Sequence, residues 1–374
     1  MDFNKKRTWA EISLENIKHN YESIRKELPD GCKFLGVVKA DAYGHGAVRV
    51  AKLLQDCGAD YLAVACLDEG IELRENGITM PILILGHTPT EFTKYLIDYN
   101  ITQAVSCLEY AKEFSNEATK LGKELKIHVK IDSGMGRLGF ICAGDSFTKG
   151  VEEVYEACQL PGLVHEGIFT HFAVSDEEGA VNRNFTHDQF KLFMEMINAL
   201  KEKGIEFEIR HCANSGAVVS YPEVFLDMVR PGLLLYGYGD TSGRLGLKPC
   251  MSLYTTVSAL KTYKKDVSIS YGRLFTTDQT TKVAVLSIGY ADGLPRIASG
   301  KFKFYSEYGL ARQVGRICMD MCMVNVNRFA EIKVGDRFEI FGEHADLNIQ
   351  SKKAQTIPYE FMCGITKRVP RIYI

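Results

Sequence analysis

Lys33-Phe34-Leu35-Gly36-Val37-Val38-Lys39 is followed directly by Ala40-Asp41-Ala42-Tyr43-Gly44-His45-Gly46. The apolar run is typical of a β-strand buried on both faces, and it brings Lys39 to the carboxyl end of that strand. Low-dielectric surroundings favour the neutral amine, so a lysine in this position can form an imine as a nucleophile and later act as a base. From this segment alone, a lysine whose charged end merely reaches water at a strand end is an equally good interpretation.

Seven more candidate strands follow this first one. Together the eight cover residues 33–39, 61–65, 82–86, 102–106, 126–132, 163–171, 208–214 and 228–236. An opening helix is expected near 14–28, and amphipathic stretches such as 47–55 and 187–203 separate the strands. Eight parallel strands that alternate with helices predict an α/β fold with an N-terminal (β/α)8, TIM-like barrel.

The chemistry of such a barrel lies at the carboxyl ends of its strands. Lys39 lies at one of these ends, and several other polar residues lie at or after the later strands. They are Lys130 and Arg137, then His171, Asn214 and Ser215, and finally Arg230. We therefore expect these side chains to meet at one rim of the barrel.

The sequence changes character beyond about residue 245. Short β-rich segments at 255–260, 282–287, 324–326 and 337–341 are separated by turn signals such as Gly335-Asp336. A glycine-rich stretch near 237–248 is typical of a linker. We therefore predict a barrel over residues 11–240 and a mainly β C-terminal domain over 245–374. We expect an N-terminal strand within residues 1–10 to join that β domain.

Composition limits the class of protein. The chain has 374 residues, which is too long for one ordinary core, and its formal net charge of −2 with no basic block gives no footprint for nucleic acid or an anionic membrane. No apolar signal core or membrane-spanning run is found, so we expect a cytoplasmic protein. Eleven cysteines without C-x-x-C spacing indicate reduced thiols, and nine histidines without ligand spacing predict no metal site.

One motif has two interpretations. Gly134-Met135-Gly136-Arg137-Leu138-Gly139 matches the G-x-G-x-x-G pattern of dinucleotide-binding folds. The pattern also requires a helix that opens at the third glycine, and Phe140-Ile141-Cys142 is a poor helix start. We therefore expect no nicotinamide cofactor at this loop.

Several segments together resemble the motifs of bacterial alanine racemases, which are fold-type III pyridoxal phosphate enzymes. They cover nearly the whole chain: 37–46, 130–139, 169–173, 211–217, 229–237, 270–272, 288–293, 315–321 and 357–365. The resemblance implies a pyridoxal 5'-phosphate cofactor and an amino-acid substrate. It also implies a homodimer with shared active sites that makes D-alanine for peptidoglycan precursors.

The resemblance assigns the two bases that a racemase needs on opposite faces of its substrate. Lys39 matches the lysine that carries the cofactor, and Tyr271 in Ser270-Tyr271-Gly272 matches the second base. Because a free tyrosine titrates near about 10, Tyr271 needs a neighbour such as His171, which is linked to Arg230. Without the resemblance, His171 would be interpreted as a core histidine and Arg230 as part of an ion pair at the barrel rim.

The remaining site residues follow from the same resemblance. Arg230 faces the pyridine nitrogen and, because arginine does not readily lose its proton, leaves that nitrogen unprotonated. The other cofactor contacts implied are Tyr43, His171, Asn214, Ser215, Gly232, Leu233 and Tyr359, with His211, Cys318 and Asp320 as supporting residues. From the residues alone, Ser215 could equally be a helix cap and Tyr43 a surface residue.

The resemblance also supplies the substrate contacts. Arg137 binds the substrate carboxylate, and Lys130, which is carbamylated in related enzymes, orients that arginine. Met319 offers its backbone amide across the dimer interface, and Tyr290 lines the way into the site. The methionine cluster around Met319 would otherwise be interpreted as core filler.

Alternative functions differ from alanine racemisation at identifiable residues. A serine racemase of the kind linked to vancomycin resistance would need only one or two pocket changes, since an apolar site rejects an added hydroxyl only modestly. A non-catalytic pyridoxal phosphate carrier lacks the second domain that holds Tyr271 and Met319. A decarboxylase places an acidic residue where this chain has Arg230.

Overall fold

The computed structural model describes residues 7–240 and 242–374, and the chain forms two compact units. The larger unit contains Lys18–Ala42 and Ala47–Leu247. The smaller unit contains the N-terminal segment up to Ile17, the short segment Tyr43–Gly46, and Lys248–Ile374. Each unit has its own buried apolar core.

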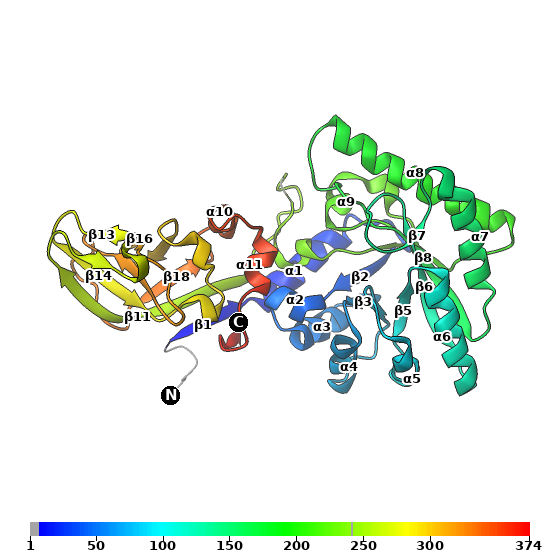
Figure 1. The fold of residues 1–374 in the computed structure, drawn as a ribbon, viewed down its shortest axis with the longest axis horizontal. Coiled ribbons are helices and arrows are strands. Elements are labelled where there is room, and N and C mark those ends of the chain that lie inside the picture. The colour runs from blue at the N-terminus through cyan, green and yellow to red at the C-terminus, as the bar shows by residue number, and fades with distance from the viewer. Residues whose placement is uncertain (1–6, 241) are drawn as a thin grey trace. The chain divides into compact units, whose positions relative to one another are not determined.

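The larger unit is built on a parallel sheet (Figure 1). Within the described residues its main path has eight strands in the order β10-β2-β3-β4-β5-β6-β8-β9, and the short strand β7 (Phe140–Ile141) pairs with β6 beside it. They are β2 (Lys33–Val37), β3 (Tyr61–Val64), β4 (Ile82–Ile84), β5 (Thr102–Val105), β6 (Leu125–Asp132), β8 (Leu163–Phe169), β9 (Ile209–His211) and β10 (Met228–Val229). The strands at the two ends of this order, β9 and β10, are also connected. Backbone hydrogen bonds run from Asp227 N to Arg210 O (3.1 Å) and from Arg230 N to Ala213 O (2.8 Å). The predicted barrel is thereby confirmed.

Helices lie outside the strands of this unit (Figure 1). They are α3 (Ala47–Asp56), α4 (Leu67–Glu75), α5 (Thr93–Asp98), α6 (Leu108–Leu121), α7 (Phe147–Cys158), α8 (Ala180–Glu202) and α9 (Ser215–Ser220), and α1 (Leu14–Arg25) precedes β2. In α3 the buried residues recur every three or four positions, which gives one apolar stripe against the strands. None of the helices in the described part of the chain is both long enough and apolar enough to span a membrane.

Several strand predictions were too long. The apolar run 228–236 is interrupted by Pro231-Gly232, so β10 ends at Val229 and Leu233–Tyr236 form a 3₁₀ helix. Proline has no N–H to donate to a neighbouring strand, which explains why the strand stops there. The expected strand at 163–171 likewise ends at Phe169, two residues before His171.

The smaller unit is mainly antiparallel β-structure, as predicted (Figure 1). Its sheet has the order β14-β17-β16-β15-β18-β11-β1-β19, and a further pairing of β14 with β11 closes the first six strands into a ring. The bounds are β1 (Thr8–Ile12), β11 (Met251–Tyr263), β14 (Thr281–Leu286), β15 (Lys303–Ser306), β16 (Gly309–Val314), β17 (Cys322–Asn325), β18 (Arg337–Phe341) and β19 (Arg371–Tyr373), with β12 (Ser268–Ile269), β13 (Phe275–Thr276), α10 (Leu347–Lys353) and α11 (Pro358–Cys363) beside them. Thr8 of β1 lies opposite Thr255 of β11, so the N-terminal strand is part of this sheet.

Candidate active site

Lys39 is the first residue of α2 (Lys39–Gly44), directly after β2. The turn is left-handed, because Ala40, Asp41, Ala42 and Tyr43 have φ values of 52°, 54°, 53° and 53°. Such a run costs free energy in L-residues, and strain of this kind is often found at functional sites.

Side-chain carboxylates hold this turn in place. Glu69 accepts hydrogen bonds from Ala40 N (2.6 Å) and Ala65 N (2.7 Å), one to each oxygen. Asp41 Oδ1 accepts a hydrogen bond from Ala47 N (2.7 Å). Lys39 is therefore fixed between a buried strand and a tightly bonded turn.

Basic residues from several strand ends meet near Lys39. Burial, followed by the charges of Arg137, Arg230 and Lys39, lowers the pKa of Lys130 to about 8. Lys130 is only 5 % exposed and makes no ion pair with any described residue; its ammonium lies over the Phe169 ring instead. Several cations close together at one rim, with Lys130 and Arg230 buried, are suited to binding anions such as a phosphate or a carboxylate.

Arg230 begins a hydrogen-bonded chain through the interior of the barrel. Its Nη1 lies 2.9 Å from His211 Nδ1, and His211 Nε2 lies 2.9 Å from His128 Nδ1. His128 Nε2 then lies 3.2 Å from Glu166 Oε2. Arginine can only donate, so both histidines carry their proton on Nε2 and each donates to the next group.

The protonation states of the residues in this series of hydrogen bonds agree with donation from Arg230 toward Glu166. Burial lowers the pKa of His128 and, much further, that of His211, so both rings are neutral. Burial alone would raise the pKa of Glu166, but hydrogen bonds from His128 and Lys126 outweigh it and bring the value to about 2. A carboxylate inside the barrel thus balances the Arg230 charge through two neutral rings.

His171 receives its own hydrogen bond from Arg230, whose Nη2 lies 3.3 Å from His171 Nδ1. Burial, and then the Arg230 charge, lowers the pKa of His171 well below its ordinary value. The ring is therefore neutral, and its proton lies on Nε2, where it can be donated to a ligand or to a second base.

Ser215 is the first residue of α9, and the cap of that helix is Asn214 and not Ser215. Its Oγ accepts hydrogen bonds from Gly232 N (2.9 Å) and Leu234 N (3.5 Å), which leaves its own proton to donate to an anion. The Gly232 amide is thus already bonded to the protein. Asn214 is the helix cap: its Oδ1 accepts from Ala217 N (3.0 Å), and its Nδ2 donates to Phe172 O (3.3 Å).

In the smaller unit, Tyr271 lies in an exposed turn. Its side chain is 70 % exposed, and Ser270 and Gly272 on either side have φ values of 70° and 67°. Ser270 Oγ donates to Arg316 O (2.7 Å) and lies 3.5 Å from Cys318 Sγ, so this turn is attached to the loop that carries Met319. Cys318 itself packs against the core of this unit.

Tyr43 and Tyr359 also come together in this unit. Their ring centroids are 6.5 Å apart at 75°, an edge-to-face contact. Burial raises the pKa of Tyr43, so its hydroxyl remains protonated and can act as a donor. Of the other predicted residues, Tyr290 and Met319 lie on two segments of this unit joined by backbone bonds, from Tyr290 N to Cys318 O (3.0 Å) and from Ala291 N to Met319 O (3.0 Å).

The glycine-rich loop 134–139 does not form a phosphate-binding turn. Asp132 Oδ1 accepts hydrogen bonds from Gly134 N and Gly136 N, both at 3.0 Å, and Oδ2 accepts one from Arg137 N at 3.1 Å. Phe140–Ile141 then form the short strand β7 instead of a helix. The amides that would hold a phosphate already bind the carboxylate of Asp132, which argues against a dinucleotide at this loop.

Comparison with known proteins accounts for the arrangement of these residues. Two family models match, the alanine racemase N-terminal domain over residues 12–240 and the alanine racemase C-terminal domain over residues 250–373. The chain belongs to the alanine racemase family. Racemases of this family are pyridoxal phosphate-dependent enzymes that act on alanine, so the chain is an amino-acid racemase.

Individual relatives cover the whole chain. The alanine racemase of Clostridium perfringens is 43% identical over 100% of this chain and 97% of its own length. The structure of alanine racemase from Clostridium difficile 630 has a TM-score of 0.91 and 43% identity, covering 98% of this chain and 96% of its own. A complex of that enzyme with cycloserine has a TM-score of 0.89 and 41% identity, with coverages of 98% and 96%.

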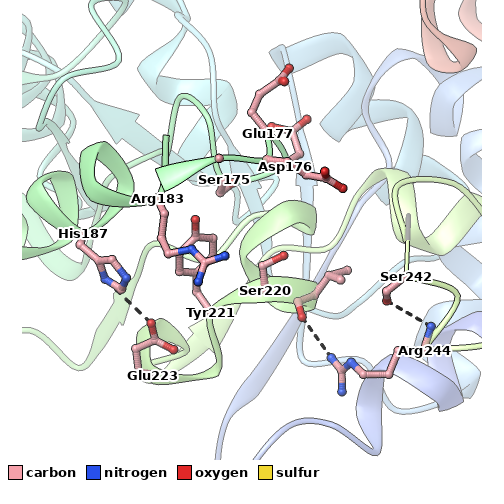
Figure 2. Close-up of a pocket in the computed structure, with 13 residues that line it drawn as sticks. Ser175, Asp176, Glu177, Arg183, His187, Ser220, Tyr221, Glu223, Ser242 and Arg244 are labelled. Carbon is pink, nitrogen blue, oxygen red and sulfur yellow. Dashed lines mark hydrogen bonds and ion pairs between the residues drawn. The ribbon is translucent and has the colours of Figure 1, made fainter. Parts of the chain in front are cut away.

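A cavity in the larger unit of the racemase is lined by none of the predicted site residues. It has a volume of about 640 Å³ and lies beside the loop after β8 (Figure 2). Its lining is Ser175, Asp176, Glu177, Glu178, Gly179, Arg183, His187, Val219, Ser220, Tyr221, Glu223, Ser242 and Arg244. His187 Nδ1 lies 3.9 Å from Glu223 Oε1, and Arg244 forms an ion pair with Glu27.

Sequence reasoning missed two residues of the racemase that support Arg230, namely His128 and Glu166. A signal for His128 exists, because Lys126, His128 and Lys130 alternate along β6 and so share one face of an otherwise apolar strand. Glu166 has the same kind of signal within β8. Buried polar residues on a barrel strand need partners, and here those partners lead to the predicted site.

Proposed function

We propose that this racemase interconverts L- and D-alanine with pyridoxal phosphate held covalently on Lys39, and that Lys39 and Tyr271 are its two bases. The observation that carries the proposal is the group of cations at the barrel rim, where Arg230, Arg137, Lys130 and Lys39 all lie close enough to His171 to lower its pKa further than burial alone does. When bound, pyridoxal phosphate withdraws electrons from the substrate and so stabilises the carbanion left after proton removal.

The residues present fit this cofactor. Arg230 offers only N–H donors, so it would hold the pyridine nitrogen in its unprotonated form. The Ser215 hydroxyl and the Leu233 amide would bind the phosphate, and the resemblance adds the hydroxyls of Tyr43 and Tyr359. Arg230 is a weakly acidic donor, so the pyridine nitrogen would withdraw fewer electrons from the substrate than a protonated one. This suits an enzyme that only exchanges a proton.

The two proton transfers need groups of matched basicity. Lys39 would remove or return the proton on one face of the substrate and Tyr271 on the other. A neutral His171 with its proton on Nε2 can donate to the phenolic oxygen of Tyr271 and so stabilise the phenolate. Arg230 fixes that tautomer through its bond to Nδ1 (3.3 Å).

The substrate carboxylate needs donors of its own. Arg137 is exposed, and its guanidinium makes no hydrogen bond to any described residue, so it can bind the carboxylate directly. Lys130, with a pKa near 8, has a neutral amine available to react with carbon dioxide, and the resulting carbamate would orient Arg137. The Met319 amide is the second donor in this proposal.

We further propose that two copies of the chain share their active sites. Tyr271 and Met319 are 70 % and 53 % exposed, and Leu274, Tyr290 and Met321 add further exposed apolar surface to the same unit. A base that is exposed to bulk water has little selectivity for the proton of the substrate. A second copy that covers these residues would exclude water from the reaction. We also propose a cytoplasmic enzyme that supplies D-alanine for peptidoglycan.

Chemical trapping tests the proposal. The purified protein should absorb visible light, and borohydride should fix the cofactor on the peptide that contains Lys39, while Lys39→Ala should lose turnover. Recovery of the label on another lysine would refute the assignment. Comparing kcat/KM for L-alanine and L-serine decides the substrate, and a preference for serine would favour the alternative racemase.

A further inference from the structure

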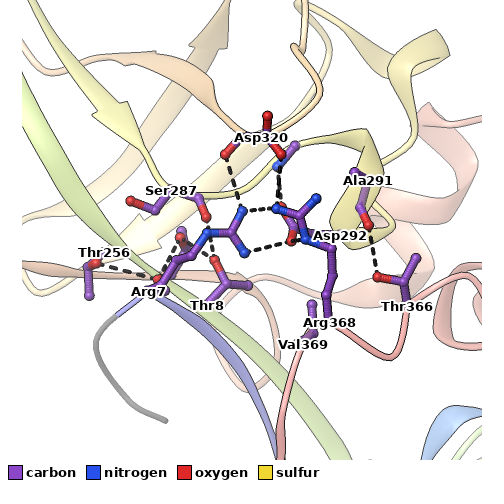
Figure 3. Close-up of polar contacts among 12 residues, drawn as sticks. Arg7, Thr8, Thr256, Ser287, Ala291, Asp292, Asp320, Thr366, Arg368 and Val369 are labelled. Carbon is purple, nitrogen blue, oxygen red and sulfur yellow. Dashed lines mark hydrogen bonds and ion pairs between the residues drawn. The ribbon is translucent and has the colours of Figure 1, made fainter. Parts of the chain in front are cut away.

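Asp292 is a fully buried carboxylate held between two arginines of the smaller unit (Figure 3). Arg7 binds it with two parallel hydrogen bonds, Nη1 to Oδ1 at 2.7 Å and Nη2 to Oδ2 at 2.9 Å. Arg368 Nε lies 3.1 Å from Oδ1. Such bidentate, charge-assisted hydrogen bonds fix the orientation of the carboxylate and also stabilise the fold.

The same carboxylate closes the turn that carries Tyr290. Asp292 Oδ2 accepts a hydrogen bond from Gly289 N (2.9 Å), at the start of the 3₁₀ helix Tyr290–Asp292. The turn fits closely against the loop that carries Met319, because a Cβ on Gly289 would lie 2.3 Å from Met319 O. The positions of Tyr290 and Met319 are thus coupled.

The two arginines also hold the Met319 loop from its other side. Arg368 Nη2 donates to Asp320 Oδ1 (2.9 Å), and Arg7 Nη2 donates to Asp320 O (3.4 Å). Figure 3 shows both guanidinium groups between the two aspartates. Asp292 and Asp320 are therefore cross-linked by the same pair of cations.

The groups that this network presents have no use inside the described chain. The Met319 backbone N–H and the Tyr290 hydroxyl make no hydrogen bond to any described residue, and the two side chains are 53 % and 41 % exposed. A donor fixed in place without a protein acceptor is ready to bind a ligand.

We propose that Asp292 is a positioning residue that sets the Met319 amide and the Tyr290 hydroxyl for the substrate carboxylate, with Arg7 and Arg368 holding it in place. The proposal rests on the proposed function, in which Met319 is a substrate contact. The network acts on binding alone, because none of its members carries a proton to or from the substrate.

The test compares three variants with the wild-type holoenzyme. Arg368→Gln removes the contacts to both aspartates at a side chain 41% exposed, so this variant should fold even where Asp292→Asn fails. KM for L- and D-alanine should rise about tenfold while kcat changes little, since one hydrogen bond to a charged group contributes on this scale. The inhibition constant of acetate, a carboxylate without an amine, should rise by the same factor.

Arg210→Gln is the matched control. Arg210 makes an equivalent bidentate pair with Asp227 in the larger unit (2.7 and 3.0 Å), so its loss should lower the melting temperature without changing KM or acetate inhibition. If Arg368→Gln behaves like this control, Asp292 has only a structural role and the proposal is overturned. If the wild type itself fails to racemise alanine, the proposed function fails instead.

Discussion

Arg230 combines two tasks that usually belong to different residues. One terminal nitrogen bonds to His211 (2.9 Å), and the other bonds to His171 (3.3 Å) and to the backbone oxygen of Thr170 (2.8 Å). The guanidinium therefore fixes the tautomers of two histidines at once. Burial lowers the pKa of Arg230 to about 10, which still leaves it charged at neutral pH.

At the residue scale, Tyr271→Phe should separate the two bases. The variant should keep its cofactor, because only an exposed hydroxyl is removed, but racemisation should fall by about 10² or more. Exchange of the α-proton in deuterated water should survive only for the enantiomer whose proton Lys39 removes. Equal residual exchange from both enantiomers would refute the two-base mechanism.

Lys130 leads to a prediction about pH. Its amine becomes neutral as the pH rises through about 8, and only the neutral amine reacts with carbon dioxide. Protein equilibrated with ¹³C-bicarbonate should show a carbamate carbon signal that grows over this range and is absent in Lys130→Met. Lys126→Met, on the same strand but paired with Glu166 (2.7 Å), should keep the signal. A signal that survives in Lys130→Met would assign the modification elsewhere.

At the scale of elements, the left-handed turn after Lys39 should store strain. Ala40 is exposed and has a φ of 52°, so Ala40→Gly should raise the free energy of unfolding by about 1 kcal/mol, because glycine adopts this conformation without a Cβ clash. Urea denaturation with an unchanged slope would measure the gain.

The same substitution in an ordinary helix is the control. Ala199 lies inside the right-handed helix α8, so Ala199→Gly should lower the free energy of unfolding by about 1 kcal/mol. Opposite signs for the two alanines would establish that the turn, and not the residue type, determines the effect. A loss of stability in both would mean that the turn is not strained.

Sequence reasoning succeeded where local pattern determines structure. The apolar runs at 61–65 and 82–86 became the buried strands β3 and β4, because a strand covered on both faces needs no polar residue. The turn at residues 40–43 contains no glycine, so nothing in its composition indicates a left-handed conformation. Long-range contacts were equally hidden, since Arg7 and Asp292 are 285 positions apart.

The positions of several predicted site residues could be inferred from the sequence for a similar reason. Lys39, His171 and Ser215 each follow a recognisable strand, so barrel geometry alone places them at one rim. The supporting residues His128 and Asp292 depend on which buried side chains meet, which tertiary packing decides. The alternation along β6 marks His128 as a polar residue on an apolar strand, but its partner, like those of Asp292, is known only from the hydrogen bonds.

At the scale of the whole molecule, the proposal that two copies share their active sites predicts complementation between inactive variants. Lys39→Ala and Tyr271→Phe homodimers should each be nearly inactive. After subunit exchange, half of the dimers would be mixed and each would hold one intact site, so about one quarter of wild-type activity should return. Native mass spectrometry would verify the exchange. Mixed dimers without activity would indicate that both bases come from one chain.

The chain of bonds from Arg230 through His211 and His128 to Glu166 gives the barrel an electrical polarity. Every hydrogen in it is donated in the same sense, so its dipoles add, with the negative terminal at Glu166. Judged only by its distance from Lys39, Glu166 would be classed with residues that merely support the fold. In electrical terms Glu166 is the far terminal of this chain of bonds, and a substitution there should change the potential at Arg230 without contacting the proposed site.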